Sequence, residues 1–223
     1  MSTHLKIDFV SDVSCPWCVI GLQSLERALG DLKGEIDAEL HFQPFELNPD
    51  MGPGGQSIIE HLSEKYGTSP GQIEGSQDVI RQRGAELGFV FDMRKRSRIY
   101  NTFDAHRLLH WAEGEGRQPQ LKHALFEAYF TDGRDPSDHA VLIELAGKVG
   151  LDTDRARQIL ASTEYAEDVR ERERFYTSHG IHAVPAVIIN DRHLIQGGQP
   201  VAVFEQALRQ VAASTPASSP ASR

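Results

Sequence analysis

Two cysteines could carry chemistry in this chain, and they stand together in the run Ser14-Cys15-Pro16-Trp17-Cys18. A thiolate is the species that attacks a disulfide, and with two residues between them the cysteines can close a small ring. The spacing predicts thiol-disulfide exchange, with Cys15 as the nucleophile and Cys18 as the thiol that resolves the mixed disulfide. A disulfide-stapled domain spreads its cysteines along the chain, so we do not expect this pair to hold the fold together.

Two other interpretations of the pair remain open at this point. Half a zinc site is one, but zinc needs about four ligands and the chain has no further cysteine. His106 and His110 are four positions apart on an expected helix, which suits either metal ligands or a polar helix face. An inert buried pair is the other interpretation. We expect no metal site and no tightly bound cofactor, only a redox-active disulfide.

The residues around the cysteines predict a strand that leads into a helix. Alternating apolar residues predict a strand over 5–10. Ser14 suits the N-cap position and Pro16 the first turn of a helix. Apolar residues at helical spacing continue to Gly30, where the helix can end. A second strand is expected near residues 40–45, which completes a β-α-β unit.

The other end of the chain predicts a hairpin followed by a helix. Residues 186–189 are rich in β-branched side chains, a turn follows at 190–192, and residues 193–195 return as the second strand. A helix is expected after Pro200. Residues 56–179 look almost wholly helical. We therefore expect an α/β fold with a discontinuous domain over 1–55 and 180–213 and a helical insertion over 56–179. Residues 214–223 are rich in Ser, Pro and Ala, which predicts a disordered tail.

Composition restricts the partners. The formal net charge of −9 argues against nucleic-acid binding, and no apolar stretch is long enough to span a membrane. The first residues lack a basic segment followed by an apolar one, so we expect no secretory signal and a cytoplasmic protein without a membrane partner. The basic run over 94–98 is expected to be a solvated loop, or else to steer an anionic partner.

Several motifs together resemble the DsbA-like thioredoxin superfamily, and within it the soluble FrnE-like branch. The matching runs are 11–18 with Gly21, 45–50, 101–108, 128–133 and 180–186. The resemblance implies a thioredoxin fold with an inserted helical domain, and a protein-disulfide oxidoreductase acting on thiol or disulfide substrates. It also implies a cis proline at Pro185 that, with Val184, forms one wall of the site beside Pro16 and Trp17. Trp17 stands where DsbA itself has a histidine, which predicts a milder redox potential because an indole gives the thiolate no positive charge.

Related proteins of the kappa-class glutathione transferase and 2-hydroxychromene-2-carboxylate isomerase group imply an alternative function. These relatives have a serine in place of the first cysteine. Positions that match their glutathione contacts are Asn48, Val184, Gly198 and Gln199, so glutathione is a candidate co-substrate. Asn101 is either a helix cap or a cleft residue, and His106 is a further candidate for substrate binding. A chaperone or scaffold with a vestigial cysteine pair is the third class of function.

Overall fold

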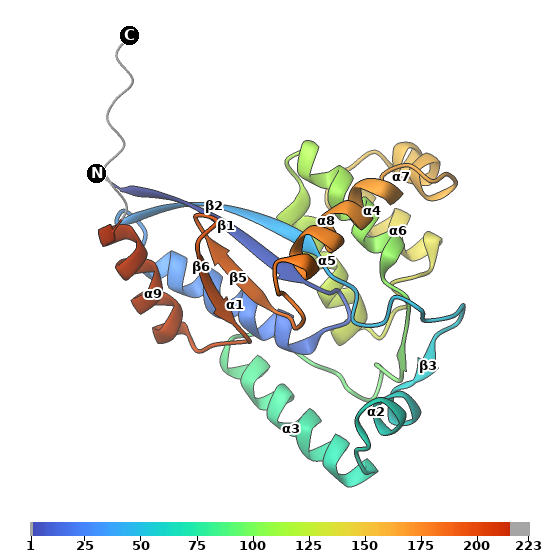
Figure 1. Ribbon diagram of the computed structural model, residues 1–223. Coiled ribbons are helices and arrows are strands. Elements are labelled where there is room, and N and C mark those ends of the chain that lie inside the picture. The colour runs from blue at the N-terminus through green and yellow to red at the C-terminus, as the bar shows by residue number, and fades with distance from the viewer. Residues whose placement is uncertain (1, 215–223) are drawn as a thin grey trace.

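The computed structural model describes residues 2–214, and its centre is a four-stranded mixed sheet (Figure 1). The strand order is β2 (Ile36–Pro44), β1 (Thr3–Ser11), β5 (Ala186–Ile189) and β6 (His193–Gln196). β1 and β2 are parallel, with Thr3 opposite Ile36, whereas the other neighbours are antiparallel. The predicted β-α-β unit and terminal hairpin are therefore confirmed. The first two strands both begin earlier than expected.

Side-chain alternation along β1 explains how the sheet is covered. Leu5, Ile7 and Phe9 belong to one core together with apolar residues of α1 (Pro16–Asp31) and α9 (Val201–Ser214). Val10 points to the other face and packs with Tyr176 of α8 (Ala166–Ser178). Because β1 is buried on both faces, it fixes the position of the loop that follows it.

The segment between β2 and β5 is mostly helical, as expected. Its helices are α2 (Ile58–Tyr66), α3 (Pro70–Glu86), α4 (Phe103–Gly114), α5 (Gln118–Phe126), α6 (His139–Lys148), α7 (Thr153–Leu160) and α8, with a π-helical turn at Glu127–Thr131. It also contains two short antiparallel strands, β3 (Gln56–Ser57) and β4 (Arg98–Ile99), which the sequence did not predict. The exact domain boundaries stay a prediction.

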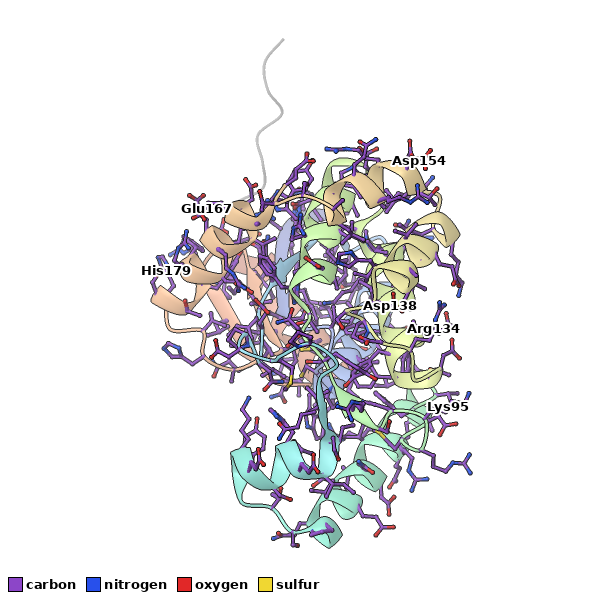
Figure 2. The ribbon with its side chains drawn as sticks, turned by 90° about the vertical axis from the view of Figure 1, so that its right-hand side faces the viewer. Lys95, Arg134, Asp138, Asp154, Glu167 and His179 are labelled. Atoms are coloured by element: carbon purple, nitrogen blue, oxygen red, sulfur yellow. The ribbon has the colours of Figure 1, made fainter. Side chains whose placement is uncertain are left out.

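The helices of this segment form two groups. Helices α4 to α7 share an apolar core of their own, built from residues such as Leu108, Leu121 and Leu142. Helices α2 and α3 lie apart from this group, below the sheet in the view of Figure 1. Lys95, labelled in Figure 2, belongs to the loop that leads from α3 back to the other helices. Ile80 of α3 joins the core under the sheet, together with Phe91. The arrangement leaves α2 and α3 opposite the start of α1.

The two ends of the described chain differ in detail from the predictions. Ser14 is not the N-cap of α1: Cys15 occupies that position, and the Ser14 hydroxyl donates to Asp12 Oδ2 instead (3.0 Å). Ser214 is the last residue of α9, and residues 215–223 of the predicted tail lie outside the described residues. Within residues 2–214, none of the helices has the length and apolar character needed to cross a membrane.

Candidate active site

The two cysteines lie at the junction between β1 and α1. β1 ends at Ser11, and Cys15 has an extended backbone (φ −91°, ψ 112°) before Pro16 opens the helix. Cys15 is 4% exposed and Cys18 is completely buried, and both are free thiols. Cys15 therefore sits at the N-terminal, positive end of the helix dipole. Cys18 lies one turn deeper, in the packed interior.

The Val184–Pro185 segment faces the first cysteine. The peptide bond between these two residues is cis, as the resemblance implied. The thiol of Cys15 donates to the carbonyl oxygen of Val184, with a sulfur–oxygen distance of 3.8 Å. Gly21 allows α1 to approach, because a Cβ at that position would be 3.0 Å from Cγ of Pro185. The structure thus brings Cys15 to the backbone of residue 184.

A cavity of about 590 Å³ opens in front of Cys15, and we call it the cleft. One wall is the cysteine loop with Val184, and the other is formed by α2 and α3. Its volume lies within the range of small-molecule sites. Its full lining is Ser14, Cys15, Pro16, Trp17, Leu47, Asn48, His61, Leu62, Lys65, Tyr66, Thr68, Ile73, Ser76, Gln77, Ile80, Arg96, Ile99, His182, Ala183 and Val184.

The charges of the cleft have one sign. Lys65 and Arg96 are the charged side chains that line it, and none of its lining residues is an aspartate or a glutamate. Burial and the neighbouring charge of Lys65 lower the pKa of His61. Such a surface favours a substrate with carboxylate groups. The wall contributed by α2 and α3 had no signal in the sequence, because only the folded chain brings these helices to the cysteines.

The run over 94–98 is exposed as predicted, except at Arg96. Its side chain is only 7% exposed and lies over the rings of Tyr129 and Phe130, 5.0 and 4.9 Å from their centres. Nη2 donates to the carbonyl oxygen of Ser14 (3.3 Å). Arg96 therefore joins the inserted segment to the residue next to Cys15.

The predicted site residues separate into those at the cleft and those away from it. Pro16, Trp17, Asn48 and Val184 line it with Cys15, and Asn48 Oδ1 accepts from Lys65 Nζ (2.8 Å). Trp17 is 37% exposed.

The loop before α9 supports Trp17 from outside the cleft. A Cβ at Gly198 would lie 3.0 Å from the carbonyl oxygen of Trp17. From α3, the guanidinium of Arg83 lies 5.7 Å from the centre of the Trp17 indole ring. Gln199 donates through Nε2 to Gln196 within its own loop (2.7 Å). Gly198 and Gln199 are not among the cleft-lining residues.

Asn101 and His106 also lie outside the cleft. Thr102 is the N-cap of α4, so the N-cap role considered for Asn101 is wrong; Asn101 precedes the cap, and its Oδ1 accepts from the backbone N–H of Phe103 (2.9 Å). His106 is 2% exposed, and its Nε2 lies 3.6 Å from Asp12 Oδ1. His110 packs its ring against Tyr165, with 5.1 Å between the ring centres. Residues 2–214 contain no group of three or more side chains placed to hold a metal ion.

A buried cluster of ionisable groups lies beneath the cysteines. Asp12 is completely buried and accepts from the backbone N–H of Ser14 (3.1 Å) and of Leu47 (2.7 Å). Burial opposes its ionisation, but the contact with His106 and these N–H groups outweigh burial and lower the pKa of Asp12 to about 2. Asp12 thereby ties the cysteine loop to the segment after β2.

Lys122 of α5 belongs to the same cluster and is only 1% exposed. Burial lowers the pKa of Lys122 to about 8, although the charges of Cys18, Asp12 and Cys15 act in the opposite direction. Burial and the hydrogen bond with Cys15 raise the pKa of the Cys18 thiol well above its ordinary value, whereas Lys122 acts to lower it. No pattern in the sequence predicts a buried lysine at this position of the inserted segment.

Comparison with known proteins agrees with this geometry. The family model of the DSBA-like thioredoxin domain matches residues 6–209. The crystal structure of a probable DsbA oxidoreductase from Streptomyces coelicolor is 34% identical, with a TM-score of 0.89 over 97% of this chain and 94% of that one. The uncharacterized protein YwbO of Bacillus subtilis is 28% identical over 93% of this chain and 96% of its own length. The cytosolic disulfide reductase DsbM of Pseudomonas aeruginosa, solved with GSH, is similar in fold at 18% identity, with a TM-score of 0.62 over 92% of this chain and 98% of that one. The chain therefore belongs to the DSBA-like thioredoxin domain family.

Proposed function

We propose that this protein is a thiol-disulfide oxidoreductase of the FrnE-like branch, with Cys15 and Cys18 as its catalytic residues. The observation that carries the proposal is the position of Cys15, at the N-terminus of α1, on the wall of the cleft and in contact with the backbone of Val184. A thiol at this point is open to a substrate disulfide and is activated by the helix end. Cys18, one turn deeper, is kept from competing for the substrate.

The reaction proceeds by two exchanges. The thiolate of Cys15 attacks one sulfur of the substrate disulfide and forms a mixed disulfide, while the other substrate sulfur leaves as a thiolate that takes a proton from solvent. Cys18 then loses its proton and attacks Sγ of Cys15, which releases the second substrate thiolate. The substrate disulfide is reduced by two electrons, and the Cys15–Cys18 disulfide holds the oxidising equivalent.

The cleft supports a small anionic substrate, and glutathione disulfide is the natural probe. Its basic lining, without a carboxylate, suits the carboxylates of the tripeptide, and the cavity has the size of a small-molecule site. The similar fold of DsbM, a cytosolic disulfide reductase solved with GSH, supports both glutathione as co-substrate and a cytoplasmic location. In a reducing compartment the resting pair is the dithiol, which favours reduction or isomerisation.

Trapping tests this function directly. In a Cys18→Ala variant the mixed disulfide on Cys15 cannot be resolved, so incubation with glutathione disulfide should leave one glutathione adduct per chain in the intact mass spectrum. The Cys15→Ala variant, which keeps only the buried Cys18 thiol, is the matched control and should stay unmodified. An equal amount of adduct on both variants, or on neither, would remove Cys15 from the chemistry.

The second candidate is a glutathione-dependent isomerase or transferase, and the cleft that suits glutathione is the observation in its favour. The two functions differ in their need for sulfur at position 15. A Cys15→Ser, Cys18→Ser double variant should lose all disulfide reductase activity. If this variant instead catalysed the glutathione-dependent isomerisation of a chromene carboxylate as well as the native protein does, the second function would replace the first.

A further inference from the structure

Arg96 is a buried cation that forms no ion pair with a carboxylate in the part of the chain that the structure describes. It is 7% exposed, and its Nε is buried without a hydrogen-bond partner. Its Nη2 donates to a neutral group, the carbonyl oxygen of Ser14 (3.3 Å). The buried carboxylate of the same loop, Asp12, already accepts from Ser14 and Leu47. Buried charged side chains are normally paired, so Arg96 is left with a charge that a ligand can neutralise.

The inserted segment builds a fixed cradle for this guanidinium. Tyr129 and Phe130 are almost completely buried, and their ring centres lie 5.0 and 4.9 Å from it. Both belong to the π-helical turn Glu127–Thr131, and such turns often occur at functional sites. The Tyr129 hydroxyl donates to the carbonyl oxygen of Arg98 (2.8 Å), which anchors the chain just after Arg96. These contacts hold the guanidinium in place without neutralising its charge, because both rings are neutral.

Arg96 and Cys15 line the same cavity, the cleft. The carbonyl oxygen that accepts from Arg96 belongs to the peptide bond on the N-terminal side of Cys15, so the guanidinium lies next to the backbone of the nucleophile. A substrate whose sulfur is bonded to Cys15 therefore brings its neighbouring groups toward Arg96. Lys65 is the other charged residue of the lining, and Arg96 is the one of the two that is hydrogen-bonded to the residue before Cys15.

We propose that Arg96 binds a carboxylate of the substrate close to the sulfur that Cys15 attacks, and so makes the protein select small disulfides that carry carboxylates. This role rests on the disulfide exchange proposed above. A hydrogen bond between a guanidinium and a carboxylate is stronger than one between neutral groups, and arginine keeps its charge at every working pH. The exchange takes no proton or electron from Arg96. The residue decides which disulfide reacts and leaves the two-step chemistry as it is.

Three small disulfides of similar size test this selection. They are 3,3′-dithiodipropionate with two carboxylates, 2-hydroxyethyl disulfide without charge, and cystamine with two ammonium groups. Each is added in excess to reduced protein, and oxidation is followed by acid quenching, alkylation and intact mass spectrometry. Rates with dithiothreitol correct for the intrinsic reactivity of each disulfide. The native protein should then react with dithiodipropionate at least about tenfold faster than with hydroxyethyl disulfide, the factor expected for one hydrogen bond between charged groups. Cystamine should react more slowly than the uncharged compound.

Variants of the basic run distinguish binding from a structural role. Arg96→Met should reduce the preference for dithiodipropionate by about tenfold and change the rate with hydroxyethyl disulfide by less than about twofold. A residue that only supported the Ser14 backbone would instead slow all three disulfides alike. Arg96→Lys retains the charge and should keep part of the preference. Arg94→Met is the matched control, because the side chain of Arg94 is 93% exposed and its charge is screened by salt, so the preference should not change.

Equal corrected rates with the anionic and the uncharged disulfide in the native protein would overturn the role of Arg96, and this comparison needs no variant to fold. Equal slowing of both compounds in Arg96→Met, or an equal loss of preference in Arg94→Met, would do the same. If none of the three disulfides oxidises Cys15 and Cys18, the proposed disulfide exchange fails instead.

Discussion

Asp12 should give the folded protein a measurable part of its acid sensitivity. Its carboxylate is completely buried and accepts from the Ser14 backbone, the Ser14 hydroxyl and the Leu47 backbone at 3.1, 3.0 and 2.7 Å. An Asp12→Asn replacement preserves the shape of the side chain. It puts an amide, which donates, where one carboxylate oxygen now accepts, and it removes the charge beside His106.

The expected magnitude follows from linkage. The pKa of Asp12 falls from its ordinary value of 3.8 to about 2 in the folded protein. A difference of nearly two units corresponds to about 2 kcal/mol of stability. Because the pKa is lowered on folding, this contribution is complete above the unfolded value near 4 and is lost as the pH falls toward 2. Asp12→Asn should therefore lower the free energy of unfolding by about 2 kcal/mol at pH 7, and by less as the pH drops below 4.

Urea unfolding of both proteins at pH values between 7 and 3 measures this difference. Asp152→Asn is the matched control, since Asp152 is an exposed N-cap that accepts from the backbone of α7, and asparagine caps helices equally well. The control should leave both the stability and its pH dependence unchanged. A difference between the native protein and Asp12→Asn that stays constant from pH 7 to pH 3 would refute the reasoning.

Three other predictions follow from buried or cleft-lining residues. Burial and the charge of Glu173 raise the pKa of Glu46 to about 8, against the opposing effect of Arg170, so native stability should fall as the pH rises from 4.5 to 8, and Glu46→Gln should remove this fall in urea titrations. A Cβ at Gly84 would lie 2.4 Å from the Phe91 ring, so Gly84→Ala should lower the unfolding free energy by about 1 to 3 kcal/mol in thermal or urea melts. Lys65→Met should raise the KM for glutathione disulfide by about two- to fivefold with kcat unchanged in a coupled reductase assay, as expected for one exposed charge pair.

Each of these has an outcome that contradicts it. An unchanged pH slope in Glu46→Gln would show that the carboxylate ionises normally. Gly75 lies on the same helix with no atom within 4 Å of an added Cβ, so Gly75→Ala should stabilise, and equal effects at the two glycines would exclude the Phe91 contact. Lys148→Met serves as the control for Lys65→Met, and an equal rise in KM would place the effect outside the cleft.

Local sequence patterns predicted many of the strands and helices. Alternation at Leu5, Ile7 and Phe9 predicted β1, because the residues of a strand point to its two faces in turn. Pro16 after the first cysteine predicted the start of α1, since proline fits the first turn of a helix. The pairing of Cys15 with Cys18 needed only their spacing. One local rule competed with another: Ser14 could have capped the helix, but its hydroxyl donates to Asp12, two residues earlier.

The sequence by itself determined the two thiols, the strand-to-helix junction at which the first one lies, and the helical character of the insertion. The tertiary structure alone decided what surrounds them. Arg96 belongs to a basic run whose other residues are exposed, yet it lies buried against Ser14. Phe126 of a separate helix packs in the same core as Cys18. These contacts join residues about 80 and 110 positions apart, and they depend on how helices pack rather than on the periodicity within any one of them.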